Sequence, residues 1–452
     1  MLPPVLKGFL PSPPGPYQVG YAYVANPPLS PFHHVYPQLK STGQPAFQVQ
    51  EISYCVFYPC TPGTDGSKKK HVQGVRWVSE PFWQVIEGYK RFLGRNGKMA
   101  WLMGPIGYIT GRVQMPVYPR TFLAPPSTKG QAYPLVIFSH GLAGTRHTYS
   151  QYCSSLASEG YVVLSVEHRD GSGPAILLPE QEGGNDGGQS EKPKVLHYIH
   201  ADDLVWKQGE EHSAEYGRTL QLDIRTREVY EAYHSFKRLL SPTGDEKIRV
   251  ENLSGGDKVS WVDSFKGKVN LDDLRLAGHS FGGGTILHLL QTPSPSPSVL
   301  TALPVTQAIA LDPWLESLPT PSDVISPPSH TLPPLLVINS PGFTEWREHW
   351  GRLVDLVKGR GTLVTMMGIG HQGFSDFPLL SPVGYSNAHS MLNQIHTLST
   401  SFLKRTLSSD PALVGKEADD GNYQKDTADG LSIQGKKNMK NGDILLHLVG
   451  KE

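Results

Sequence analysis

Short apolar runs recur through the middle of the chain, and each is nearly free of polar residues. They are Leu135–Phe138, Tyr161–Val166, Leu274–Ala277, Gln307–Leu311, Leu335–Ile338 and Thr362–Met367. Such runs are typical of strands that are buried on both faces of a parallel sheet. Helical candidates lie between several of them, at Thr148–Ser158, Leu220–Leu240, Gly284–Leu290 and Arg347–Val357. This alternation predicts an α/β fold with a central, mostly parallel sheet flanked by helices.

The same patterns divide the chain into three parts. Residues 1–16 are Pro-rich, and we expect an extended segment. Two strands are predicted next, at Gly20–Val24 and Ala46–Phe57, from their β-branched and aromatic residues. The strand–helix alternation resumes after the Pro-rich stretches 292–298 and 317–334, so residues 17–406 are predicted to form a single domain. Residues 407–452 are polar and are expected to form a flexible tail, apart from an apolar patch at Ile444–Val449.

Residues 76–115 combine many aromatic side chains with basic ones, and their spacing predicts one or two amphipathic helices. Two interpretations stay open. The aromatic side chains cover the core, or they form a cap that faces lipid or substrate, because aromatic and basic residues together suit a membrane interface.

The amino-acid composition argues against several classes of function. Lys+Arg and Asp+Glu both number 41, so net charge gives no reason to expect a nucleic-acid partner. The cysteines, Cys55, Cys60 and Cys153, fit neither a disulfide scaffold nor a Cys-x-x-Cys zinc site, and we expect free thiols. The N-terminal residues lack the pattern of a signal peptide, and no apolar run approaches the roughly 20 residues that span a bilayer. A cytoplasmic protein is therefore expected.

The strongest chemical signal is the G-x-S-x-G sequence at residues 278–282, whose serine is Ser280. It lies directly after a predicted strand and directly before a predicted helix. This strand–turn–helix context is that of a nucleophile elbow in an α/β-hydrolase fold, in which a sharp turn exposes the serine hydroxyl. Ser280 is therefore the candidate nucleophile.

A nucleophilic serine requires amide donors for the oxyanion that forms during attack. One is expected from Phe281, the residue after the nucleophile, and the other from a loop that follows an earlier strand. The sequence Ser139-His140-Gly141-Leu142 ends such a strand, and we assign the second donor to the Leu142 amide. A simple strand-ending turn is the alternative interpretation of this loop.

The serine also requires a histidine base, which should come later in the chain. Seven histidines follow Ser280: His288, His330, His349, His371, His389, His396 and His447. Of these, His371 follows a predicted strand through the Gly-rich turn Gly368-Ile369-Gly370, as expected of a base on a loop. His371 is therefore the candidate base.

The acid should lie between serine and histidine in the sequence. Asp312 directly follows the predicted strand Gln307–Leu311, and functional groups gather at the carboxyl ends of strands in open α/β sheets. The next strand, Leu335–Ile338, has no carboxylate after it until Glu345, which is the fallback candidate. A helix cap or turn before Pro313 is the structural alternative for Asp312.

These motifs resemble those of the plasma and intracellular type II platelet-activating factor acetylhydrolases, the group VII phospholipases A2. The matching sequences follow the family order over roughly residues 15–400: Gly15-Pro16-Tyr17-x-Val19-Gly20, Trp101-Leu102-Met103-Gly104, Phe138-Ser139-His140-Gly141-Leu142, Val166-Glu167-His168-Arg169-Asp170, Gly278-His279-Ser280-Phe281-Gly282-Gly283, Ala310-Leu311-Asp312-x-Trp314 and His371-Gln372-x-Phe374-x-Asp376-Phe377.

The resemblance implies calcium-independent hydrolysis of short or oxidised sn-2 acyl groups of phosphoglycerides. It also implies shallow docking on lipid surfaces, and it places the family's acid at Asp312. No metal or other cofactor is expected, and the sequence does not indicate an oligomeric state. Two other functions stay open, a general carboxylesterase acting on small soluble esters and a non-catalytic lipid-binding protein. The charged sequence Glu167–Asp170 is interpreted as a structural hydrogen-bond network rather than a second site.

Overall fold

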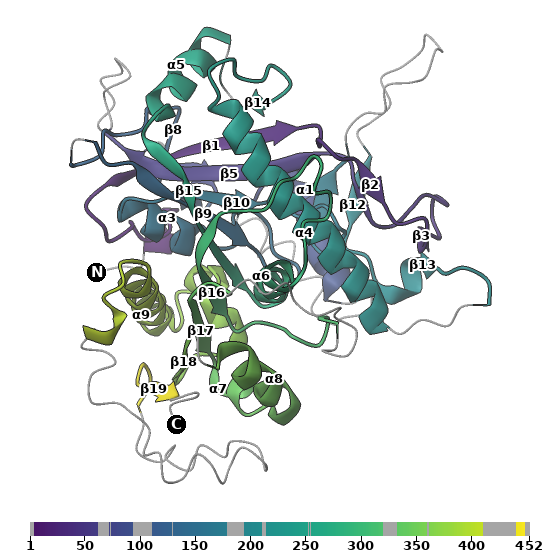
Figure 1. Ribbon diagram of the computed structural model, residues 1–452. Coiled ribbons are helices and arrows are strands. Elements are labelled where there is room, and N and C mark those ends of the chain that lie inside the picture. The colour runs from purple at the N-terminus through teal and green to yellow at the C-terminus, as the bar shows by residue number, and fades with distance from the viewer. Residues whose placement is uncertain are drawn as a thin grey trace.

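The computed structural model describes residues 4–61, 72, 74–93, 111–128, 130–178, 194–209, 214–251, 253, 255–319, 332–358, 361–409 and 440–447. A long twisted sheet runs through the molecule, with helices on both of its faces (Figure 1). Its strands lie in the order β14-β1-β5-β10-β9-β15-β16-β17-β18-β19, and β8 pairs with β1. These strands are β1 (Gln18–Asn26), β5 (Ile52–Cys60), β8 (Tyr118–Pro119), β9 (Tyr133–Ser139), β10 (Val162–Val166), β14 (Arg249–Val250), β15 (Val269–His279), β16 (Val305–Leu311), β17 (Leu335–Asn339), β18 (Gly361–Met366) and β19 (Ile444–His447).

The centre of the sheet is parallel, as the sequence predicts. Strands β10, β9, β15, β16, β17 and β18 pair with their neighbours in parallel. The N-terminal strands add an antiparallel part, because β5 pairs antiparallel with both β1 and β10. Parallel strands place their carboxyl ends at one edge of the sheet, so the segments that follow β9, β15, β16 and β18 gather there.

The sheet buries a separate apolar cluster on each face, because successive side chains of a strand point to opposite sides. In β9, Leu135 and Ile137 join one cluster, whereas Val136 and Phe138 join the other. The first cluster packs against α4 (Ala214–Leu239), α5 (Gly255–Phe265), α6 (Phe281–Gln291) and α8 (Arg347–Val357). The second packs against α1 (Phe82–Phe92), α3 (Ser150–Ser158) and α9 (Tyr385–Leu403).

Shorter elements complete the described part of the chain. They are β2 (Phe32–His33), β3 (Gln38–Leu39), β4 (Gln48–Val49), β6 (Val75–Arg76), β7 (Gln114–Met115), β11 (Ala175–Leu177), β12 (Val195–His197), β13 (Leu204–Val205), α7 (Pro341–Thr344) and the 3₁₀ turns η1 (Pro4–Lys7), η3 (Ala201–Asp203), η4 (His371–Phe374), η5 (Phe377–Leu380) and η6 (Leu407–Ser409). The single strand expected at residues 46–57 is instead divided into β4 and β5. The cysteines are free and buried, as expected.

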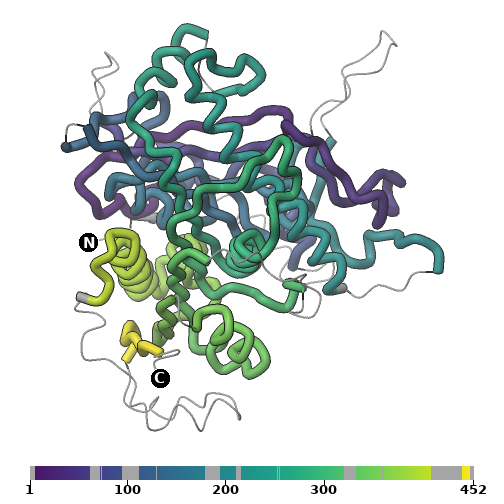
Figure 2. The backbone as a smooth tube through the Cα atoms, in the orientation of Figure 1, coloured from purple at the N-terminus to yellow at the C-terminus, as the bar shows by residue number. Residues whose placement is uncertain are grey.

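Two sequence predictions concern ranges that the structure describes only in part. In the range 407–452, residues 444–447 lie in the apolar patch that is excepted from the predicted flexible tail, and they form β19, which pairs antiparallel with β18. Figure 2 shows this last strand beside β18, so this part of the range belongs to the sheet. Of residues 76–115, the ranges 76–93 and 111–115 are described, and they contain one helix, α1. The remaining residues, with the motif at 101–104, lie outside the described ranges.

Candidate active site

Ser280 lies at the junction between β15 and α6, where the chain turns sharply. Its φ of 55° and ψ of −121° lie in a region that non-glycine residues rarely adopt. The glycines on either side allow the close packing that this turn requires. A Cβ atom at Gly282 would overlap the Ser139 carbonyl of β9, and one at Gly278 would overlap the Gly282 carbonyl. The predicted strand–turn–helix context is therefore confirmed.

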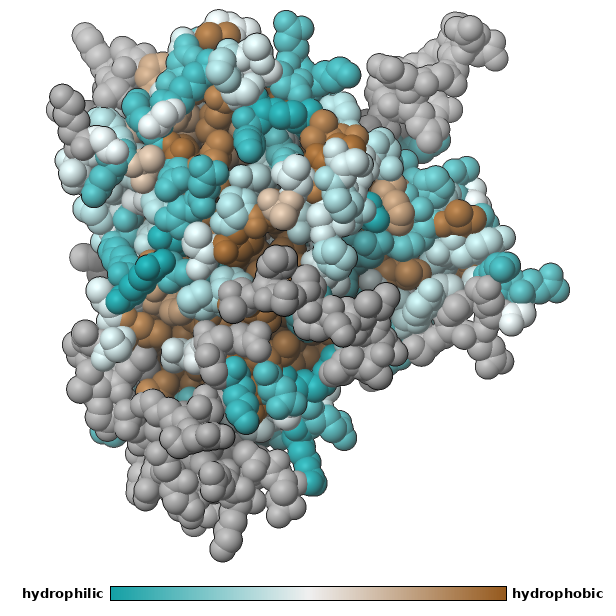
Figure 3. Space-filling model, in the orientation of Figure 1, coloured by the Kyte–Doolittle hydropathy of each residue, from teal (hydrophilic) through white to brown (hydrophobic). Residues whose placement is uncertain are grey.

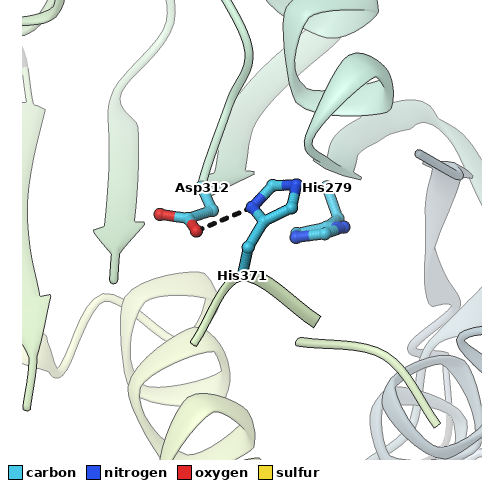
Figure 4. A group of neighbouring side chains, drawn as sticks. All are labelled: His279, Asp312 and His371. Atoms are coloured by element: carbon cyan, nitrogen blue, oxygen red, sulfur yellow. Dashed lines mark hydrogen bonds and ion pairs between the residues drawn. The ribbon is translucent and has the colours of Figure 1, made fainter. Parts of the chain in front are cut away.

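Ser280, His371 and Asp312 form one hydrogen-bonded series. The Nε2 atom of His371 is 2.9 Å from the Ser280 Oγ, and its Nδ1 atom is 2.9 Å from the Asp312 Oδ2. Figure 4 shows the imidazole of His371 pointing its Nδ1 atom at the Asp312 carboxylate. Asp312 is fully buried and Ser280 is 8% exposed, whereas the His371 side chain is 31% exposed. His371, the middle member of the series, is therefore the most exposed of the three, and the two residues on either side of it are buried.

The structure distinguishes between the two candidate acids. Asp312 follows β16, and its carboxylate accepts hydrogen bonds from the amide of Ser340 at 2.7 Å and from the Ser340 hydroxyl at 2.7 Å. These bonds and the bond to His371 fix both carboxylate oxygens. Glu345 is exposed at the end of α7. The geometry therefore favours Asp312 over Glu345 as the partner of His371.

The two amides that were predicted as oxyanion donors come from separate elements that meet at Ser280. Phe281 is the first residue of α6, so its N–H has no partner within the helix. Leu142 lies in the loop after β9, and a Cβ atom at its neighbour Gly141 would be 3.0 Å from the Ser280 Cβ. Among the described residues, no acceptor is bonded to the Leu142 amide. The loop is thus close enough to Ser280 to serve as the second donor.

A buried ion-pair network holds the loop that carries Leu142 in place. The Nε atom of Arg225 on α4 is 2.9 Å from the Asp170 Oδ2, and its Nη1 atom donates to the His140 carbonyl at 2.7 Å. Arg225 also donates to the hydroxyl of Ser172, whose carbonyl accepts the Ala143 amide at 2.8 Å. The Arg225 side chain is fully buried. This contact set agrees with the structural interpretation of the Glu167–Asp170 sequence.

Sequence reasoning missed the rings that hold His371. His371 stacks on Phe343 with ring centroids 4.5 Å apart and an interplanar angle of 4°. The His279 ring lies beside the His371 ring (Figure 4), with ring centroids 4.6 Å apart, and its Nδ1 atom is 2.7 Å from the Tyr149 hydroxyl. Burial, together with the charge of His371, lowers the pKa of His279 well below its ordinary value. His279 is therefore neutral at physiological pH and contributes packing without adding a charge.

His279, Asp312 and His371 also satisfy the spacing of a metal site, since one ligand atom of each lies within 4.8 Å of the others. A cation there would compete with the hydrogen bonds that His371 makes to Ser280 and Asp312. The donor set therefore fits a proton-transfer role better than a metal role.

Asp376 connects the His371 loop to the N-terminus of α3. Its carboxylate accepts from the Ser150 amide at 2.8 Å, the Ser150 hydroxyl at 2.6 Å, the Gln151 amide at 3.1 Å and the Trp77 indole at 2.9 Å. Burial raises the pKa of Asp376 to about 7, although the donors from Ser150, Trp77 and Gln151 act in the opposite direction. Asp376 thus ties three separate chain segments together beside the site.

We expect Asp376→Asn to change how stability depends on pH. Because the folded-state pKa lies above the unfolded value, the folded protein binds more protons between about pH 4 and 7. This carboxyl therefore adds stability below pH 4 that is lost as the pH rises through 7. Urea unfolding at pH 5 and at pH 7.5 should show that the free energy of unfolding falls less between these two pH values in the variant than in the wild type. Equal decreases in the two proteins would contradict the assignment.

Comparison with known proteins finds a matching family and several related proteins. The family model described as "Platelet-activating factor acetylhydrolase, isoform II" matches residues 7–403. A platelet-activating factor acetylhydrolase of Gallus gallus is 30% identical over 277 residues, which cover 61% of this chain and 59% of the relative. The enzyme of Canis lupus familiaris is 29% identical over 315 residues, which cover 68% of this chain and 61% of the relative. The chain thus spans about three fifths of the length of these relatives.

A solved structure confirms the fold class. The ferulic acid esterase from Streptomyces cinnamoneus superimposes with a TM-score of 0.54 at 17% identity, covering 91% of this chain and 97% of that protein. At this identity the likeness concerns the fold alone, and it confirms the predicted α/β-hydrolase architecture. Within the described ranges, no helix combines the length and the apolar composition needed to cross a bilayer.

Proposed function

The chain belongs to the platelet-activating factor acetylhydrolase isoform II family, and from this premise we propose that it is a serine esterase acting on phosphoglycerides. Its substrates would be lipids with a short or oxidised acyl group at the sn-2 position. The observation that carries the proposal is the hydrogen-bonded series Ser280–His371–Asp312 at the carboxyl edge of the sheet. The names of the relatives in chicken and dog support the choice of a lipid ester.

The proposed reaction has two halves. The Ser280 oxygen attacks the sn-2 carbonyl while His371 takes its proton, and the amides of Leu142 and Phe281 stabilise the oxyanion. When the intermediate collapses, His371 returns the proton to the leaving glycerol oxygen, and an acyl-enzyme remains. Water then attacks the acyl-enzyme with His371 as base, which releases the carboxylic acid and restores Ser280. Asp312 stabilises the imidazolium that forms in each half.

As a further part of this proposal, helix α1 contacts the lipid surface. Val85 and Ile86 bury one face of the helix, whereas Trp83 is 64% exposed and Leu93, directly after the helix, is 61% exposed. Lys90 and Arg91 lie on the same helix and suit an anionic membrane surface. The ring of Tyr89 contacts Phe377 in η5, close after His371 in the chain. The described part of this segment thus agrees with both interpretations, because it contributes side chains to the core and also exposes apolar ones.

The test is a series of phosphatidylcholines whose sn-2 chain lengthens from acetyl to palmitoyl, assayed with EDTA present. We expect rapid release of acetate and a steep decrease in kcat/KM as the chain lengthens. Nitrophenyl acetate serves as the soluble control ester. Cleavage of this ester without any phospholipid turnover would refute the lipid assignment and favour a general carboxylesterase. Loss of all turnover in EDTA would refute the metal-independent mechanism.

A further inference from the structure

A large cavity lies away from Ser280, on the part of the sheet beyond β10. Its volume is about 1410 Å³, and neither Ser280, His371 nor Asp312 lines it. Its walls come from β1, from the segment around Glu51, from residues 75–80 with β6, from β11 and from β14. The loop between β9 and α3 contributes Arg146 and His147. The cavity therefore occupies the antiparallel end of the sheet, separate from the candidate active site.

Positive charge exceeds negative charge in the lining of this cavity. The basic residues are Arg76, Arg120, Arg146, Arg169, Lys247 and Arg249, and the acidic ones are Glu51, Glu80, Glu167 and Glu251. One carboxylate, that of Glu51, is shared by Arg169 at 3.2 Å and Arg249 at 2.5 Å. Two guanidinium groups on one carboxylate leave a positive charge uncompensated, and this favours an anionic ligand.

Arg146 supplies a second, independent observation. Its Nη1 atom pairs with Glu167 at 2.5 Å, and its guanidinium lies 4.4 Å from the centroid of the Tyr23 ring. Within the described part of the chain, its Nε atom is buried and has no hydrogen-bond partner. A buried donor that stays unpaired costs free energy, so a small shift of the Arg146 side chain toward an acceptor in the cavity would be favourable.

Six apolar side chains form another part of the cavity wall. They are Val75, Val78, Ile176, Leu177, Leu178 and Leu253. Leu177 is 38% exposed, so part of its side chain is open to contact with a ligand. The volume exceeds the 300–1,000 Å³ range of ordinary small-molecule pockets, so a molecule longer than a drug-sized ligand would fit.

We propose that this cavity binds a single-chain lipid that carries a phosphate group. The phosphate accepts hydrogen bonds from Arg146, Arg169 and Arg249, and the hydrocarbon chain lies along the wall formed by Ile176, Leu177 and Leu178. Arginine matches phosphate geometry through two parallel N–H donors. This inference does not depend on the proposed reaction at Ser280, because no residue named for the cavity is also named for that reaction.

The test is calorimetric titration of the full chain with a 1-alkyl lysophosphatidate, which has no carboxylic ester bond and therefore offers Ser280 no acyl group to hydrolyse. The lipid is kept below its micellar concentration. Arg249→Glu changes a side chain that is 71% exposed, and we expect the dissociation constant to rise at least about tenfold. Lys358→Glu makes the same charge change on an exposed residue after α8, at the other end of the sheet, and should leave binding unchanged.

Two further arms separate the lipid from free phosphate. Leu177→Ser should weaken lysophosphatidate binding and leave the binding of inorganic phosphate unchanged, because it shortens only the apolar wall. Competition by inorganic phosphate at millimolar concentration would support the guanidinium site. If Arg249→Glu and Lys358→Glu bound the lipid equally, the proposal would be overturned. Equal affinities for lysophosphatidate and inorganic phosphate would overturn the lipid assignment in favour of free phosphate.

Discussion

Replacing Ser280 by alanine is expected to lower kcat for ester hydrolysis by about a millionfold, to the residual rate that oxyanion donors and binding alone supply. The effect is this large because the covalent route is lost completely, while the His371 and Asp312 contacts remain. KM should change little, since Ser280 contributes scarcely any surface for substrate binding. Acetate release from a 2-acetyl phosphatidylcholine measures the change.

The matched control is Ser260→Ala, which removes an exposed hydroxyl on α5. It should retain full activity. A fluorophosphonate should add one label to the wild type, at Ser280, and none to Ser280→Ala. Residual activity above about one per cent, or a label on another serine, would show that Ser280 is not the nucleophile.

Asp312→Asn is expected to lower kcat by about 10⁴-fold, with the fold and KM retained. An asparagine amide can present its NH₂ group to the His371 Nδ1 atom, which stabilises the imidazole tautomer that carries no lone pair toward Ser280. The Ser340 amide and hydroxyl would still find one acceptor oxygen, so the loop should keep its position. Steady-state kinetics on a soluble ester separate kcat from KM.

The fallback acid gives a direct control for this prediction. Glu345→Gln changes an exposed side chain at the end of α7 and should keep at least half of the wild-type kcat. If Glu345→Gln lost activity while Asp312→Asn kept it, the acid would have to be reassigned. Because both variants replace one carboxylate with an amide of the same size, a general effect of charge on substrate binding would appear in both.

The residues that sequence analysis brought together share one property: each follows a predicted strand, either directly or after a short turn. Ser280 follows β15, Asp312 follows β16, and His371 follows β18 after a short turn. Since parallel strands end at a common edge, the order of strands along the chain is enough to predict that these side chains meet. The sequence also favours Asp312 over Glu345, and the burial of Asp312 and its contacts with Ser340 and His371 agree with that preference.

The supporting residues could not be predicted in the same way. Tyr149 approaches His279 from a position 130 residues earlier in the chain, and Phe343 stacks on His371 from the far end of a short helix. Ring stacking leaves no periodic pattern in a sequence, because it depends on the angle at which two loops meet. Likewise, His279 lies inside the G-x-S-x-G motif at a position where any residue type is allowed, so the motif does not predict a role for it.

Strand β19 has a consequence for association between molecules. It comes from residues 444–447, beyond the end of the family match at residue 403, and it covers the outer edge of β18. His447 fastens it there, with its Nε2 atom 2.7 Å from the Thr365 hydroxyl and its ring against Trp350. Without this strand, β18 would present a row of unpaired amides and carbonyls, which is a template for pairing with another chain. The four residues of β19 therefore replace the longer β18 as the edge of the sheet beside the loop that carries His371, and a short edge strand offers fewer groups for pairing with another chain.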